Sequence, residues 1–221
     1  MKHMIIAAHP DDEVLGCGGT IINRVKKGDE VVVVILTDGA VTRYKKPMAK
    51  ILRKNALACA KILGVSKVIF KDLPNQLLDS IPITRVIKAI EAVMAEIKPD
   101  TVYTHDKGDL NRDHAVIYEA TLVAARPLPG SKVKKLFTYF VPSSSEYNDV
   151  DEKAIFIPNV FVDIKAGIDK KIKAFACYKS ERRAYPHPRS PEALRVYAKR
   201  WGIQAGIEYG EPFRLIRETA D

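Results

Sequence analysis

An unbroken run of aliphatic side chains, Val31 to Leu36, is the feature that most restricts how this chain folds. A strand with one exposed face alternates apolar and polar residues, whereas a continuous run is typical of a parallel strand covered on both faces. Helical patterns flank the run, from Asp12 to Lys27 before Gly28 and from Pro47 to Leu63. This alternation predicts a mainly parallel sheet with helices on both faces.

The alternation continues along the chain. Further strands are expected at Met4–Ala8, Lys67–Phe70, Thr101–Thr104, Lys135–Val141 and Val160–Ile164, and further helices at Ile83–Ile97, Asp113–Arg126, Lys165–Tyr178 and Pro191–Ala205. Loops are expected at Thr42–Lys46, His105–Arg112, Pro142–Asp151 and Ser180–Ser190. The predicted fold class is α/β, a Rossmann-like, doubly wound sheet. With 221 residues, 47% of them hydrophobic, and no internal repeat, a single domain over residues 1–221 is expected.

Composition argues against several classes of protein. No segment approaches the roughly 18 continuous apolar residues of a membrane span, so no integral membrane segment is expected. The first strand is expected almost at the start of the sequence, so no signal peptide is expected. Cys17, Cys59 and Cys177 form an odd set without CxxC spacing. Buried thiols and a cytoplasmic location are therefore the favoured interpretation.

The chain is basic, with a net charge of +9, and the basic excess leans toward its C-terminal quarter. Such an excess attracts nucleic acid, membrane surfaces or anionic small molecules. No zinc-finger spacing, RNA-recognition signature or long basic block is present, so no nucleic-acid partner is expected. A small-molecule substrate with an anionic group and a solvated basic face explain the charge equally well. The oligomeric state stays open, a homo-oligomer included.

The residues best suited to chemistry follow the first predicted strand. His9, Asp11 and Asp12 come directly after Met4–Ala8. The carboxyl ends of strands are where open α/β sheets bind their ligands. An imidazole and a carboxylate are suitable ligands for zinc or a related divalent metal. Because adjacent carboxylates can divide ligation from proton transfer, this segment predicts a catalytic metal site.

A second polar cluster, from His105 to His114, follows the fourth predicted strand. Right-handed crossovers often make the first and fourth strands neighbours where the strand order reverses, so the two clusters are expected to face each other. His9, Asp12 and His114 then offer two nitrogens and one oxygen and leave positions open, as catalytic zinc sites do. Asp113 is suited to orient one imidazole through a hydrogen bond.

These segments resemble the signatures of a known family. Ala8–Thr20 (AHPDDEVLGCGGT) and Asp109–His114 (DLNRDH) are similar to motifs of the LmbE-like, or PIG-L-like, de-N-acetylases. Supporting similarities lie at Leu36–Gly39, Leu73–Asp79, Pro142–Glu146 and Tyr209–Phe213. The resemblance implies a Rossmann-like (LmbE-like) fold and a zinc-dependent enzyme. It also implies removal of the acetyl group from an N-acetylglucosamine unit in a small glycoconjugate.

The resemblance assigns roles to individual residues. It implies that Zn²⁺, or another divalent metal, is held by His9, Asp12 and His114, and that Asp11 is the general base. Many relatives carry a histidine where this chain has Asn111, and an asparagine supplies no proton near neutral pH. Asp11 returning its proton and His187 reaching into the site are the remaining proton sources for the leaving amine, with Asp11 the simpler.

The resemblance predicts substrate contacts at Arg53, Asn75 and Asn111. The competing interpretations are a surface arginine for Arg53, a turn asparagine for Asn75 and a residue that shapes the loop for Asn111. Gly16, Gly18 and Gly19 suggest either a phosphate-binding turn or close helix packing. The GxGxxG spacing is not met, which favours packing. A nucleotide-binding Rossmann protein, which the missing GxGxxG spacing disfavours, and a metal-dependent hydrolase of another bond are the alternative functions.

Overall fold

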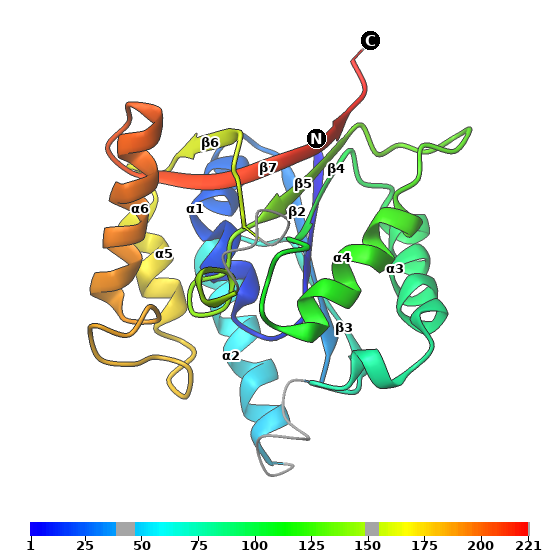
Figure 1. The fold of residues 1–221 in the computed structure, drawn as a ribbon, viewed down its shortest axis with the longest axis horizontal. Coiled ribbons are helices and arrows are strands. Elements are labelled where there is room, and N and C mark those ends of the chain that lie inside the picture. The colour runs from blue at the N-terminus through cyan, green and yellow to red at the C-terminus, as the bar shows by residue number, and fades with distance from the viewer. Residues whose placement is uncertain (39–46, 149–154, 221) are drawn as a thin grey trace.

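The computed structural model describes residues 1–38, 47–148 and 155–220. Within these residues one seven-stranded sheet has the order β3-β2-β1-β4-β5-β7-β6 (Figure 1). Its strands are β1 (Lys2–Ala7), β2 (Glu30–Thr37), β3 (Lys67–Leu73), β4 (Thr101–His105), β5 (Lys135–Tyr139), β6 (Val160–Asp163) and β7 (Gly210–Glu218). Strands β1 to β5 are parallel, whereas β7 is antiparallel to both β5 and β6. The mixed α/β class is confirmed.

Helices cover both faces of the sheet (Figure 1). One face carries α1 (Asp12–Lys26), α2 (Pro47–Leu63), α5 (Ile168–Phe175) and α6 (Pro191–Ala205), and the other α3 (Ile83–Ile97) and α4 (Arg112–Ala124). Short 3-10 helices lie at η1 (Leu78–Ser80) and η2 (Ser145–Tyr147). Successive strand side chains point to opposite faces, so Val33 packs toward α1 and α2 while Val32 packs toward α3. This two-sided burial accounts for the unbroken apolar run of β2.

The C-terminal part of the sheet differs from the prediction. No strand was expected after Ala205, yet β7 lies between β5 and β6. Pro212 and Glu211 interrupt its apolar pattern, and both lie where β7 pairs with β6. The helix expected at Lys165–Tyr178 is shorter, because Gly167 precedes its first turn. The loop expected at Thr42–Lys46, Gly39 of the Leu36–Gly39 similarity and the end of the Pro142–Asp151 loop lie outside the described residues.

The glycines of α1 allow close packing against neighbouring side chains. A Cβ atom on Gly16 would lie 2.3 Å from Tyr139 Cδ2, and one on Gly19 would lie 2.5 Å from Ile164 Cγ2. Both distances are shorter than a van der Waals contact, so a residue with a Cβ atom at either position would force Tyr139 or Ile164 to move. The packing interpretation of these glycines is thus favoured over a phosphate-binding turn, because side chains occupy the space that a phosphate would need.

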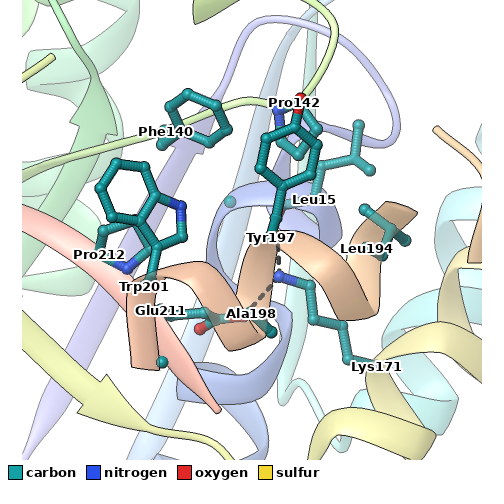
Figure 2. A pocket seen from close by; sticks show the side chains of 12 residues that line it. Leu15, Phe140, Pro142, Lys171, Leu194, Tyr197, Ala198, Trp201, Glu211 and Pro212 are labelled. Atoms are coloured by element: carbon teal, nitrogen blue, oxygen red, sulfur yellow. Dashed lines mark hydrogen bonds and ion pairs between the residues drawn. The ribbon is translucent and has the colours of Figure 1, made fainter. Parts of the chain in front are cut away.

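A buried ion pair joins α1 to the C-terminal third of the chain (Figure 2). Lys171 Nζ lies 2.7 Å from Glu211 Oε1 and donates a 2.8 Å hydrogen bond to the carbonyl of Leu15. Glu211 accepts hydrogen bonds of 2.7 Å from the backbone N–H groups of Gly19 and Thr20. Side chains of α5 and β7 therefore satisfy backbone groups in the middle of α1 and fix its position.

No helix among residues 1–38, 47–148 and 155–220 has the length and apolar character needed to cross a membrane.

Candidate active site

The two polar segments meet at the carboxyl ends of β1 and β4, which are parallel neighbours as predicted. His9 follows β1, and His114 lies in the first turn of α4, directly after the loop that leaves β4. His9 Nδ1 lies 3.2 Å from His114 Nε2, and Asp12 Oδ2 lies 3.3 Å from each of these nitrogens. We call His9, Asp12 and His114 the ligand triad. One nitrogen or oxygen of each lies within 4.8 Å of the others.

A second carboxylate orients the imidazole of His9. His9 Nε2 donates a 3.1 Å hydrogen bond to Asp113 Oδ2, which leaves Nδ1 directed at the triad. Asp113 is itself held by backbone N–H groups, at 2.7 Å from Gln76 and 3.0 Å from Leu78. Asp113 thus lies beside the imidazole of His9 and outside the triad. Such partners fix the tautomer and direction of ligating histidines.

The imidazole of His114 has an ion-pair partner in Asp109. Its Nδ1 lies 3.1 Å from Asp109 Oδ1, which leaves Nε2 facing the triad. Asp109 also accepts hydrogen bonds from the Ser144 hydroxyl and, at 2.7 Å, from the Ser145 hydroxyl. Burial opposes its ionisation, but His114 and these hydrogen bonds lower the pKa of Asp109 to about 2. Asp109 therefore stays charged and fixes His114.

The surroundings of the triad stabilise positive charge. Burial alone would lower the pKa of His114, but Asp109 and Asp12 raise it to about 10. Burial would also lower the pKa of His9, but hydrogen bonds to Asp113 and Asp12 raise it above its usual value. At Asp12 burial favours the neutral acid, yet His114 and His9 hold the pKa well below its usual range. A cation is thus favoured between these side chains.

One oxygen of the triad has no partner within the protein. Asp12 Oδ1 is fully buried and accepts no hydrogen bond from the residues that the structure describes. A buried carboxylate oxygen without a donor is unfavourable unless a cation or water satisfies it. Two imidazole nitrogens and a carboxylate oxygen are the donor types that zinc binds. The residues present therefore fit a divalent metal ion.

Asp11 is adjacent to the triad in sequence but does not belong to it. Its side chain is buried, and its carboxylate accepts a 2.9 Å hydrogen bond from Arg189 Nη1. Burial raises the pKa of Asp11 well above its usual range, although Arg189 acts in the opposite direction. Asp11 is thus an ionisable group next to the candidate metal site. Among the described residues its carboxylate is not grouped with His9 and His114.

A polar cavity of about 330 Å³ opens next to these residues. Its lining comes from the start of α4, the β5–η2 turn and the segment after α5: Leu110, Asn111, Ser143, Ser144, Tyr147, Glu181, Arg183, His187 and Arg189. Arg189 links it to Asp11, and Asn111 links it to the helix that carries His114. The cavity has room and polar groups for a small substrate, and Arg189 is the residue that joins its wall to Asp11.

The residues expected around the substrate lie in different settings. Asn111 and His187 both line the cavity. Asn111 is also the N-cap of α4, since its Oδ1 accepts a 3.0 Å hydrogen bond from the N–H of Asp113. His187 Nδ1 accepts a hydrogen bond from the N–H of Arg189. Burial and the charges of Arg189 and Arg183 lower the pKa of His187, which disfavours a protonated acid at neutral pH.

Two other expected substrate residues lie away from this lining. Asn75 is buried beside Thr37, one residue before the Gln76 amide that holds Asp113. Arg53 forms an ion pair with Asp72, and its guanidinium carbon lies 4.7 Å from the centre of the Phe70 ring. The substrate contacts of Arg53 and Asn75 remain predictions.

Sequence analysis predicted the present contacts of none of three residues that shape the site, and for Asp109 it favoured a role in shaping the loop or contacting substrate. Arg189 binds Asp11, Asp109 binds His114, and the N–H of Gln76 binds Asp113. Asp109 belongs to the DLNRDH motif, and that position was its only signal. Gln76 lies in the Leu73–Asp79 similarity, but nothing in that motif indicates Asp113 as its partner. Arg189 has no local pattern that marks it, because Asp11 lies far away in the chain.

Known proteins resemble this chain over most of its length. The uncharacterized deacetylase YaiS of Escherichia coli K12 is 28% identical over 173 residues, which cover 73% of this chain and 81% of that protein. Diacetylchitobiose deacetylase of Thermococcus kodakarensis is 27% identical over 228 residues, covering 97% and 83%. The structure of N,N'-diacetylchitobiose deacetylase from Pyrococcus horikoshii matches with a TM-score of 0.78 and 25% identity, over 98% of this chain and 84% of that one.

A family comparison matches the part of the chain that carries the candidate site. The sequence profile of the PIG-L family, described as GlcNAc-PI de-N-acetylase, matches residues 4–125. This range includes Asp11, the ligand triad, Asp109 and Asp113. Because the match covers more than half of the sequence, this chain belongs to the PIG-L family.

Proposed function

We propose that this protein is a metal-dependent hydrolase that removes the N-acetyl group from an amino sugar of the N-acetylglucosamine type. The observation that carries the proposal is the ligand triad with the buried Asp11 beside it. Family membership and the names of the relatives support deacetylation as the reaction. We further propose a single Rossmann-like catalytic domain over residues 1–221, acting on a small glycoconjugate.

In this proposal His9 Nδ1, Asp12 and His114 Nε2 hold Zn²⁺ or another divalent ion. Asp113 and Asp109 keep the two imidazoles in the required orientation. When bound there, such an ion polarises an acetyl carbonyl and increases the acidity of water. The positive charge favoured by the surrounding carboxylates supports this assignment.

The protein's own groups then carry the proton transfers. Asp11 removes a proton from water as the water oxygen bonds to the acetyl carbon. The bond between that carbon and nitrogen breaks, and Asp11 returns the proton to the departing amine. The products are acetate and the free amino sugar. We favour Asp11 over His187 for the second transfer because the lowered pKa of His187 leaves it neutral at pH 7.

Acetate release is the direct test of this proposal. Purified protein, stripped of metal and then loaded with Zn²⁺, should release equal amounts of acetate and free amine from N,N'-diacetylchitobiose or another N-acetylglucosamine conjugate. The metal-stripped protein and the Asp11→Asn variant serve as controls. A loaded protein that releases neither product from a panel of N-acetylhexosamine conjugates would refute the proposed reaction.

A further experiment separates the two proton donors. His187→Ala should retain metal and most of its kcat if Asp11 returns the proton. A loss of kcat together with a flattened alkaline limb of the pH–rate profile would assign the transfer to His187, and Asn111→His should then restore part of the activity.

A further inference from the structure

Asp11 has a backbone conformation that is rare for a residue with a side chain. Its φ is 125° and its ψ is −26°, in the region that favours glycine. Strained residues of this kind persist only where the surrounding structure holds them. The contacts that restrain Asp11 therefore contribute to the geometry of the site.

The backbone of Asp11 is held through Glu13. The N–H of Asp11 donates a 3.0 Å hydrogen bond to Glu13 Oε2, and Glu13 Oε1 accepts a 2.5 Å hydrogen bond from the Tyr178 hydroxyl. Glu13 and Tyr178 are both buried. A residue 167 positions away thus secures the turn between β1 and α1, but it leaves the carboxylate of Asp11 unrestrained.

The carboxylate of Asp11 is held by Arg189. Besides its 2.9 Å bond to Asp11, Arg189 Nη1 lies 3.2 Å from Glu181 Oε2, and Arg189 Nε donates a 2.6 Å hydrogen bond to Ser143 Oγ. Its side chain is only 20% exposed. The guanidinium is fixed from two sides before it reaches Asp11, by the β5–η2 turn and by the segment after α5.

We propose that Arg189 is the positioning residue for Asp11 and sets the direction in which this carboxylate meets the reacting water. This inference rests on the proposed role of Asp11 as base. Arg189 gives Asp11 one charge-assisted hydrogen bond, and because the rigid guanidinium is anchored through Nε at Ser143, the direction of that bond is fixed. A lysine ammonium on a flexible stem does not offer this rigid geometry. Arg189 also lines the substrate cavity, so direct binding of substrate is the rival role that the experiment must separate.

The test is a comparison of kcat and KM. Arg189→Gln should lower kcat about 100-fold, the effect expected when a catalytic group is misplaced by about 1 Å, with little change in KM. Arg189→Lys should recover only part of the loss, and added guanidinium chloride at millimolar concentration should raise the kcat of Arg189→Gln. Arg182→Gln removes an exposed arginine from the same segment and should behave like the wild type.

A readout independent of catalysis accompanies the kinetics. Amide hydrogen exchange of residues 9–15 should be faster in Arg189→Gln than in the wild type and Arg182→Gln, while zinc content stays unchanged. A raised KM with unchanged kcat would overturn the proposal and assign Arg189 to substrate binding. Wild-type kcat in Arg189→Gln would overturn it outright. If the wild type is inactive on every substrate, the proposed function fails, and unchanged hydrogen exchange would then also reject the positioning role.

Discussion

Asp11 and Asp12 are adjacent in the sequence, yet their side chains have different partners. Asp12 faces two imidazoles of the triad, whereas Asp11 faces the guanidinium of Arg189. One peptide unit with an unusual φ separates these two directions. The proposed division of labour between ligand and base is consistent with this geometry of the turn between β1 and α1.

Substitution of each aspartate by asparagine should separate the two roles. Asp11→Asn should keep metal and fold while kcat falls about 10²- to 10⁴-fold, because an amide accepts no proton from water. Asp12→Asn should lose metal, since a neutral amide is a weaker ligand than a carboxylate. Zinc content by mass spectrometry and steady-state kinetics measure the two effects. Near-native turnover in Asp11→Asn would contradict its role as base.

The histidines of the triad give a prediction on metal content alone. His9→Ala and His114→Ala should each lose most of the bound zinc, because each removes one of three protein ligands. His187→Ala, which removes a histidine from the cavity wall, should retain it. Full zinc occupancy in His114→Ala would exclude that residue from the site.

His3 gives a prediction on pH and stability away from the site. Burial, followed by the charge of Arg24, lowers the pKa of His3 below 6.5. The unfolded chain then binds more protons than the folded one, so this contribution to stability is lost as the pH falls below about 6.5. Urea unfolding at pH 7.5 and pH 5.5 should show a greater loss of unfolding free energy in the wild type than in His3→Gln. Equal losses would show that His3 titrates normally.

At the scale of elements, the close packing of α1 requires glycine where the helix meets Tyr139 and Ile164. Gly16→Ala should lower the unfolding free energy by about 1–3 kcal/mol, because its Cβ would overlap the ring of Tyr139. That ring is fully buried, and its hydroxyl is hydrogen-bonded to the carbonyl of Ile6. Gly167→Ala is the matched control, since its nearest neighbour would lie at an ordinary 3.5 Å. Equal stability of the two variants would contradict the packing argument.

Local signals decided which elements were predictable. Three helices have the predicted bounds, among them α6, where Ser190 caps the first turn and Gly206 ends the last. β7 was missed because Glu211 and Pro212 interrupt its apolar pattern. Its pairing with β6, which lies far away in the chain, leaves no local signal. The triad was predictable because each ligand lies in a short motif. Arg189 was not, because its bond to Asp11 joins residues 178 positions apart.

At the scale of the whole molecule, the pair of Lys171 and Glu211 connects the family-matched part of the chain to the remainder. Glu211→Gln should lower the unfolding free energy by about 3–5 kcal/mol, because it leaves a buried ammonium without its counter-charge. Glu208 pairs with Lys165 at the surface, and Glu208→Gln should change stability by less than about 1 kcal/mol. Chemical denaturation of both variants tests this contrast, and similar losses would show that burial of the pair has little effect.

The strand order also bears on when the site forms during synthesis. The triad needs β1 and β4 paired, and Asp11 needs Arg189, which is synthesised well after His114. Glu211, which secures α1, emerges later still. A nascent chain therefore carries its first two ligands long before it can hold an ion between three. The triad is accordingly expected to assemble only after β4 and His114 have been synthesised and β4 has paired with β1.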